Sequence, residues 1–190
     1  MTTLLAFSGS ARKESLNKKL LARAVAHLQS TGVTVETVDL RELAMPIYDG
    51  DLEEAQGRPK GAEHLRERIL ATDGVLMVSP EYNGSIPPLL KNAIDWVSRP
   101  PGPLAFKGKV AGIMGVSAGA YGTITMQSHL RLTLQKLGMH LTMGSMAMTF
   151  GEKAFAPDGS FTDPKSQGFL EHYLKDLVDE VKLFESKKAT

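Results

Sequence analysis

The feature that most constrains the fold of this chain is a regular alternation between short apolar runs and longer segments with helical spacing. Runs of apolar or β-branched residues cover positions 4–7, 33–38, 74–79, 110–116 and 140–144. Such runs are typical of strands that are buried on both faces, which is the environment of strands in a parallel sheet. Consecutive parallel strands need a long crossover, and the intervening segments are long enough to supply one.

Most of the intervening segments carry apolar residues three or four positions apart, as helices with one buried face do. The first of these helices has Leu16, Leu20, Ala24 and Leu28 on that face, and the last begins near residue 164. Five strand–helix units in succession predict an α/β fold: a doubly wound five-stranded parallel sheet in the order 2-1-3-4-5, with helices on both faces. The 190 residues are expected to form a single domain, residues 1–190.

Two stretches fit neither pattern. Residues 39–60 are polar and punctuated by Pro and Gly, and residues 146–163 are also irregular. The first stretch is too long for an ordinary connection, so we expect it to lie over the surface near a site or a subunit interface.

Composition excludes several kinds of chemistry. The chain has no Cys, which rules out disulfides, thiolate metal ligands and thiol catalysis. Its five His are scattered without metal-ligand spacing, so no metal site is predicted. A net charge of +1 indicates neither nucleic acid nor an anionic membrane as a partner, and no apolar run approaches the roughly 20 residues of a spanning helix. With no secretion signal, a cytoplasmic location is expected.

The junction between the first strand and the first helix concentrates groups that bind anions. Ser10, Ser15 and Asn17 offer hydrogen-bond donors, Arg12 offers a planar charged fork, and the first N–H groups of the helix point into the loop. Ser and Asn also serve as ordinary helix caps, so capping alone is an alternative interpretation. Neither a Walker loop nor a dinucleotide fingerprint is present, because the loop has one Gly and no Gly-Lys-Ser/Thr. The set of donors favours a phosphate monoester.

Two further loops should open at the same edge, since ligands of such sheets bind beyond the carboxyl ends of the strands at the switch point. Residues 80–84 supply backbone N–H groups, an amide and an aromatic side chain, which suit the rim of a planar ring. Residues 117–122 include Gly119, where the backbone can approach a ligand closely. Each loop alone can be an ordinary turn, but three such loops at one edge favour a ligand site.

These motifs resemble the NADPH-dependent FMN reductase family, which has a flavodoxin-like fold. The motifs are Gly9-Ser10-x-Arg12-x-x-Ser15-x-Asn17, Pro80-Glu81-Tyr82-Asn83-Gly84-Ser85 and Leu90-Lys91-Asn92-Ala93-Ile94-Asp95-Trp96. The resemblance covers about residues 1–183 and implies FMN as cofactor and NADPH or NADH as reductant. The implied FMN contacts are Ser10, Arg12, Ser15, Leu16 and Asn17 at the phosphate, Pro80, Glu81, Tyr82 and Asn83 along the flavin and ribityl chain, and Ser117 and Gly119 at the pyrimidine side.

The resemblance also implies an activity. NAD(P)H would pass a hydride to the flavin N5, and an oxidised acceptor such as a quinone, chromate, an azo compound or a nitro compound would then be reduced. The cofactor carries this chemistry, so no catalytic side chain is predicted. The family further implies a homodimer or homotetramer. Residues 39–60 are where we expect a lid over the nicotinamide site or a subunit contact.

Two alternatives remain at this stage. One is a flavodoxin-type electron carrier with a protein partner, although the first loop lacks the Thr/Ser-x-Thr-Gly-x-Thr pattern of carriers. The other is an α/β module that binds no flavin. For Glu81 the sequence leaves two interpretations, a proton donor or a loop residue used for its backbone. Trp96 is expected in packing or in a subunit contact.

Overall fold

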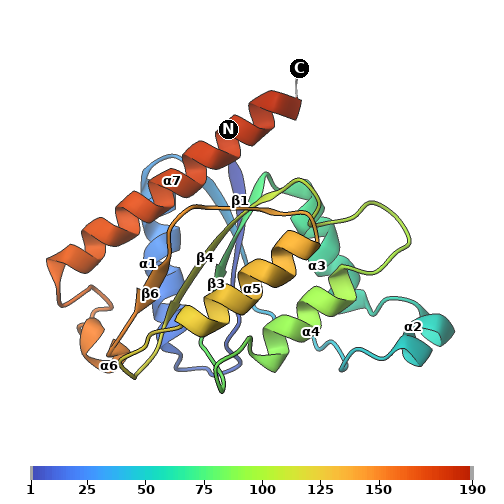
Figure 1. The fold of residues 1–190 in the computed structure, drawn as a ribbon, viewed down its shortest axis with the longest axis horizontal. Coiled ribbons are helices and arrows are strands. Elements are labelled where there is room, and N and C mark those ends of the chain that lie inside the picture. Colours follow the sequence, from blue (N-terminus) through green and yellow to red (C-terminus); the bar gives the residue numbers. More distant parts are fainter. Residues whose placement is uncertain (1, 189–190) are drawn as a thin grey trace.

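All pairings between the named strands are parallel, as the apolar runs predict. The computed structural model describes residues 2–188 and places six strands in one sheet (Figure 1). The strands are β1 (Thr3–Ser8), β2 (Thr34–Val38), β3 (Gly74–Val78), β4 (Val110–Val116), β5 (His140–Leu141) and β6 (Met146–Met148). Their order is β2-β1-β3-β4-β5, with β6 also paired to β4. The predicted order 2-1-3-4-5 is therefore confirmed.

Helices cover both faces of the sheet and enclose two apolar cores (Figure 1). The helices are α1 (Leu16–Ser30), α2 (Gly50–Gln56), α3 (Lys60–Ala71), α4 (Pro88–Val97), α5 (Ile124–Lys136), α6 (Gly151–Ala154) and α7 (Pro164–Lys188). Because side chains alternate along a strand, Leu4 and Ala6 of β1 join the core under α1 and α7. Leu5 and Phe7 join the core under α3, α4 and α5. Within residues 2–188, no helix combines the length and apolarity that crossing a membrane requires.

The sheet position beyond β4 is divided between two short strands. β5 pairs with Val110 and Ala111, and β6 pairs with residues 114–116. The predicted fifth strand therefore ends early, at Leu141. The expectation that residues 146–163 are irregular is wrong for β6 and for α6, whose lengths of three and four residues are too short to show a periodic pattern.

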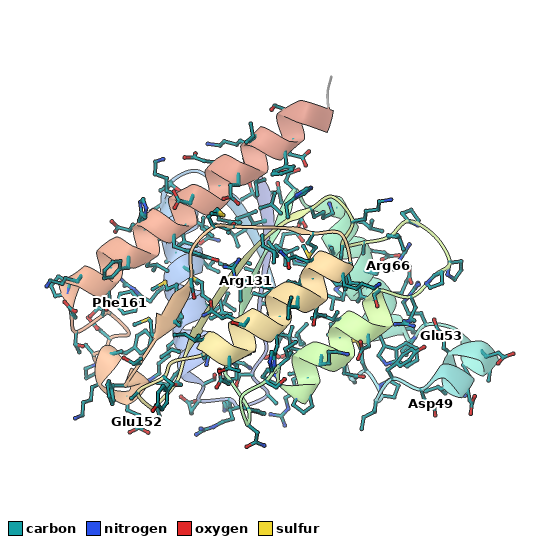
Figure 2. The ribbon with its side chains drawn as sticks, in the orientation of Figure 1. Asp49, Glu53, Arg66, Arg131, Glu152 and Phe161 are labelled. Atoms are coloured by element: carbon teal, nitrogen blue, oxygen red, sulfur yellow. The ribbon has the colours of Figure 1, made fainter. Side chains whose placement is uncertain are left out.

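Ile113 of β4 is in register with Met77 of β3, but the break between β5 and β6 leaves it without a strand partner on the opposite side of β4. Tyr173 of α7 takes that place. The N–H of Ile113 donates to the Tyr173 hydroxyl at 2.7 Å, and the hydroxyl donates to the Ile113 carbonyl at 2.9 Å. Unpaired backbone groups in a core are costly, so this hydroxyl completes the hydrogen bonding of β4. Arg131 of α5, labelled in Figure 2, holds the segment between β5 and β6 by donating to the carbonyls of Thr142 and Gly144.

Residues 39–60 are fastened to α4. Asn92 donates to the Pro46 carbonyl at 2.8 Å and accepts from the Tyr48 N–H at 2.7 Å. The indole N–H of Trp96 also donates to Pro46, at 2.8 Å, and its ring is fully buried against Tyr48. The packing predicted for Trp96 is thus confirmed. The helix α2 inside this segment was not predicted, because it has no buried residue and hence no apolar periodicity.

Replacing Tyr173 by Phe removes the hydroxyl that serves Ile113 and keeps the ring. We expect Tyr173→Phe to lower the free energy of unfolding by about 1–3 kcal/mol, measured by urea unfolding. Tyr121→Phe is the control, because Tyr121 is 87% exposed. We expect that control to change stability by less than about 0.5 kcal/mol. Equal stability of the two variants would contradict the role of the hydroxyl.

The wild type and Tyr173→Phe should also differ in how their stability depends on pH. Burial raises the pKa of Tyr173 to about 12, whereas the unfolded chain ionises near the ordinary value of 10. The stability that neutral Tyr173 contributes is therefore complete below about pH 10 and is lost as the pH rises toward 12. Between about pH 9 and 11, the wild type should lose more stability than Tyr173→Phe does. Parallel curves of unfolding free energy against pH would oppose this assignment.

Candidate cofactor site

The three loops predicted to meet follow β1, β3 and β4 and lie at the end of the sheet away from the chain termini (Figure 1). The first, second and third loops cover residues 9–15, 79–87 and 117–123. Backbone hydrogen bonds continue the strand register into them. Gly9 donates to the Val78 carbonyl at 3.0 Å, and Ser79 donates to the Met114 carbonyl at 3.0 Å. The loops are therefore held at one edge by the sheet itself.

Close backbone approaches join these loops. A Cβ on Gly9 would overlap Ser79 Oγ and would lie 3.1 Å from the Cβ of Leu90 on α4. A Cβ on Gly115 of β4 would overlap the Ser79 carbonyl and the Thr123 hydroxyl. Glycine at both positions lets the first and third loops pack directly against the chain that follows β3.

The first loop directs two hydroxyls inward, with Ser10 and Ser15 2% and 6% exposed. Ser10 Oγ accepts from the Arg12 N–H at 3.3 Å. Ser15 caps α1, since its Oγ accepts from the Asn17 N–H at 3.1 Å. The N–H of Leu16 opens the helix and has no partner within it. These donors surround a helix N-terminus, where the helix dipole favours an anion.

Arg12 supplies positive charge to this loop. Its side chain is exposed, and across the described residues its guanidinium has neither a carboxylate partner nor a side-chain hydrogen bond. A free guanidinium on the same loop as buried hydroxyls and a helix N-terminus can complement the acceptors of a phosphate group. The donor set therefore fits the phosphate end of FMN.

The side chain of Asn17 points to β4. Its Nδ2 donates to the Val116 carbonyl at 2.8 Å, and its Oδ1 accepts from the Val116 N–H at 3.0 Å. Only 3% of Asn17 is exposed. The structure thus joins the start of α1 to the start of the third loop.

The second loop turns tightly at Asn83 and Gly84. Their φ angles are 50° and 72°, and a type I′ turn needs positive values at both positions. Tyr82 and Ser85 exchange two backbone hydrogen bonds across the turn, at 3.1 and 3.0 Å. Ser85 Oγ also lies 3.1 Å from His129 Nδ1 on α5. The turn holds Tyr82 in place with 40% of the residue exposed.

Glu81 fastens the second loop to α5. Its Oε2 accepts the N–H of Met126, in the first turn of that helix, at 2.8 Å. A carboxylate at a helix N-terminus is stabilised by the helix dipole. The carboxylate is therefore engaged in the structure, which favours neither of the two interpretations from the sequence and gives Glu81 a positioning role.

The third loop is tied to the chain after β6. Ser117 donates its N–H to the Met148 carbonyl at 3.0 Å, and its own carbonyl accepts from Gly151 at 2.8 Å. The Gly119 carbonyl accepts from the Phe150 N–H at 3.0 Å. A Cβ on Gly119 would meet nothing within 4 Å, so the backbone here is open to a ligand.

Two residues beside the site were absent from the predicted set. Arg41 donates to the Ala11 carbonyl of the first loop at 3.4 Å, and it comes from the irregular stretch that sequence patterns cannot place. Phe150 is 55% exposed with a φ of 49°, a strained conformation for an aromatic residue. Its only sequence signal is the short apolar run that begins at Met146. No group of three or more potential metal ligands occurs in the described part of the chain.

The fold defines a flavodoxin-like α/β protein, with a candidate ligand site at the carboxyl ends of its strands. Residues 2–153 match the model of the NADPH-dependent FMN reductase family, and the chain belongs to that family. It is therefore an NAD(P)H-dependent FMN oxidoreductase.

Relatives and solved structures agree with this membership. An NAD(P)H-dependent FMN reductase of Pseudomonas aeruginosa is 39% identical over 175 residues, covering 92% of both chains. A quinone reductase of Escherichia coli K12 is 43% identical over 177 residues, covering 90% of this chain and 88% of the relative. The structure of FerB, a flavoenzyme NAD(P)H:(acceptor) oxidoreductase of Paracoccus denitrificans, superposes with a TM-score of 0.85. It is 34% identical, and the match covers 97% of this chain and 99% of FerB.

The contact between Gly9 and Ser79 predicts different outcomes for two Gly-to-Ala substitutions. Gly9→Ala should lower the free energy of unfolding by about 1–3 kcal/mol, because the added Cβ forces the first loop away from Ser79. Gly119→Ala is the matched control, since its Cβ enters open space. The control should leave stability unchanged or raise it by up to about 1 kcal/mol. Equal urea midpoints for both variants would argue against close packing at Gly9.

Proposed function

We propose that FMN binds with its phosphate in the first loop and its ring along the second and third loops, and that the enzyme transfers a hydride from NAD(P)H to quinone-like acceptors. The observation that carries this proposal is one short loop before α1 that holds the buried hydroxyls of Ser10 and Ser15 together with the exposed, unpaired guanidinium of Arg12. The FMN-holding residues would be Ser10, Arg12, Ser15, Leu16, Asn17, Pro80, Glu81, Tyr82, Asn83, Ser117 and Gly119.

When bound, FMN supplies the redox chemistry by accepting a hydride from NAD(P)H and returning the electron pair to the acceptor. The side chains of the site need only bind and orient. Arg12 would neutralise the phosphate, and backbone N–H groups of the second and third loops would orient the ring. Glu81 contributes by holding the second loop against Met126.

Names of relatives support the choice of acceptor. The E. coli relative and two Pseudomonas putida relatives are named quinone reductases, and a Burkholderia relative is named 2-hydroxy-1,4-benzoquinone reductase. Quinones are flat and electron-accepting, so the same open edge that takes a nicotinamide can take them in turn. Chromate, azo compounds and nitro compounds are further proposed acceptors.

An anaerobic spectrum tests the function. The purified protein loaded with FMN should show flavin absorbance that NADPH or NADH bleaches within seconds and that benzoquinone then restores. Bleaching by dithionite but not by either nicotinamide would point instead to an electron carrier. Failure to take up FMN would contradict both the cofactor assignment and the site.

We further propose that the enzyme is a cytoplasmic homodimer or homotetramer. Ile124 and Leu132 support self-association, because they are 60% and 67% exposed on α5. Light scattering of the FMN-loaded protein should give a mass of two or four chains, and Leu132→Asp should shift it toward the monomer. Lys136→Asp, at the end of the same helix, controls for the added carboxylate. A monomeric wild type would contradict the proposal.

A further inference from the structure

We propose that Asn17 is a positioning residue that locks the first loop to the third, and that its side chain matters to the ring end of a bound flavin as much as to the phosphate end. This inference rests on the flavin site proposed above. It differs from the role that the family resemblance implies, in which Asn17 belongs to the phosphate contacts alone.

The side chain is committed to a single peptide unit. Nδ2 and Oδ1 bond the carbonyl and the N–H of the same residue, Val116, at 2.8 and 3.0 Å. The two residues are 99 positions apart in the chain, and the bonds are buried. The amide thus imitates an extra strand segment laid beside the end of β4.

The pairing of the sheet explains why β4 needs this partner. The register between β3 and β4 ends with Val78 opposite Met114, and Ser79 then donates to the Met114 carbonyl. Alternate residues of a strand direct their N–H and C=O groups to the same side. The N–H and C=O of Val116 therefore point to the same side as those of Met114, where β3 has already ended. Asn17 supplies both the donor and the acceptor that a longer β3 would have supplied.

The bond joins two ends of the proposed site. Asn17 lies two residues after Ser15, the cap of α1, and its N–H is bonded to the Ser15 hydroxyl. Val116 immediately precedes Ser117, which opens the third loop. A substitution at Asn17 should therefore disturb two places at once: the phosphate donors of the first loop and the backbone of the third loop beside the flavin ring.

Riboflavin separates this role from a phosphate-binding role because it carries the ring and ribityl chain without the phosphate. We expect Asn17→Ser to raise the dissociation constants of both FMN and riboflavin by a similar factor of about ten, the equivalent of losing one or two buried hydrogen bonds. Arg12→Ala is the contrasting control and should weaken FMN while leaving riboflavin unchanged. Both constants come from fluorescence titrations of flavin-depleted full-length protein.

A second variant and a second readout keep the test decisive if Asn17→Ser folds poorly. Asn17→Asp keeps the size and the acceptor but loses the donor to Val116, and its riboflavin affinity should still fall. In the FMN-saturated protein, Asn17→Ser should also speed hydrogen exchange of the Val116 amide relative to wild type, because it removes the acceptor of that N–H.

The possible results separate cleanly. Variants of Asn17 that weaken FMN but leave riboflavin affinity and exchange unchanged would overturn the inference while the site stands. If the wild type binds neither flavin, or if Arg12→Ala weakens riboflavin as much as FMN, the proposed site itself fails and the inference fails with it.

Discussion

The structure depends on complete hydrogen bonding of β4, an interior strand that is longer than the strands on either side of it. β4 has seven residues, all buried, whereas β3 has five and β5 and β6 have two and three. Buried N–H and C=O groups beyond the reach of a strand must find other partners. Tyr173 serves Ile113 on one side of β4, and Asn17 serves Val116 on the other. The helices α7 and α1, which carry these side chains, pack on the same face, so this layer both covers β4 and completes its bonding.

The candidate site inherits its shape from this arrangement. Each of its three loops is fastened to a different element. The first loop leads into α1, whose Asn17 bonds β4; the second loop bonds α5 through Glu81, and the third bonds β6 through Ser117. Sites supported in this way by regular elements hold their donors more accurately than free loops do. This explains how three separate loops can hold many weak hydrogen-bond donors in place at one edge of the sheet.

The sequence predicted the sheet order and the meeting of the loops because both follow from long apolar runs and from the geometry of parallel crossovers. It missed β6 and α2 for opposite reasons: β6 is too short to show alternation, and α2 buries nothing. The bonds of Asn17 and Tyr173 could not be predicted either, because they depend on where neighbouring strands stop. The residue types of a motif can indicate a ligand. The hydrogen-bond partner of each side chain, however, depends on where the neighbouring strands end.

The division of the edge beyond β4 also bears on how the protein behaves at high concentration. A long, flat edge strand offers a row of unpaired backbone groups on which another chain can add a strand. Here that edge consists of the two residues of β5 and the three residues of β6. The chain between them is bonded to Arg131 of α5 instead of continuing as a strand. At the opposite edge, β2 carries the charged Glu36, paired with Arg68. Both borders of the sheet are thereby poor templates for uncontrolled strand addition, so the self-association proposed above would use helical surfaces such as α5.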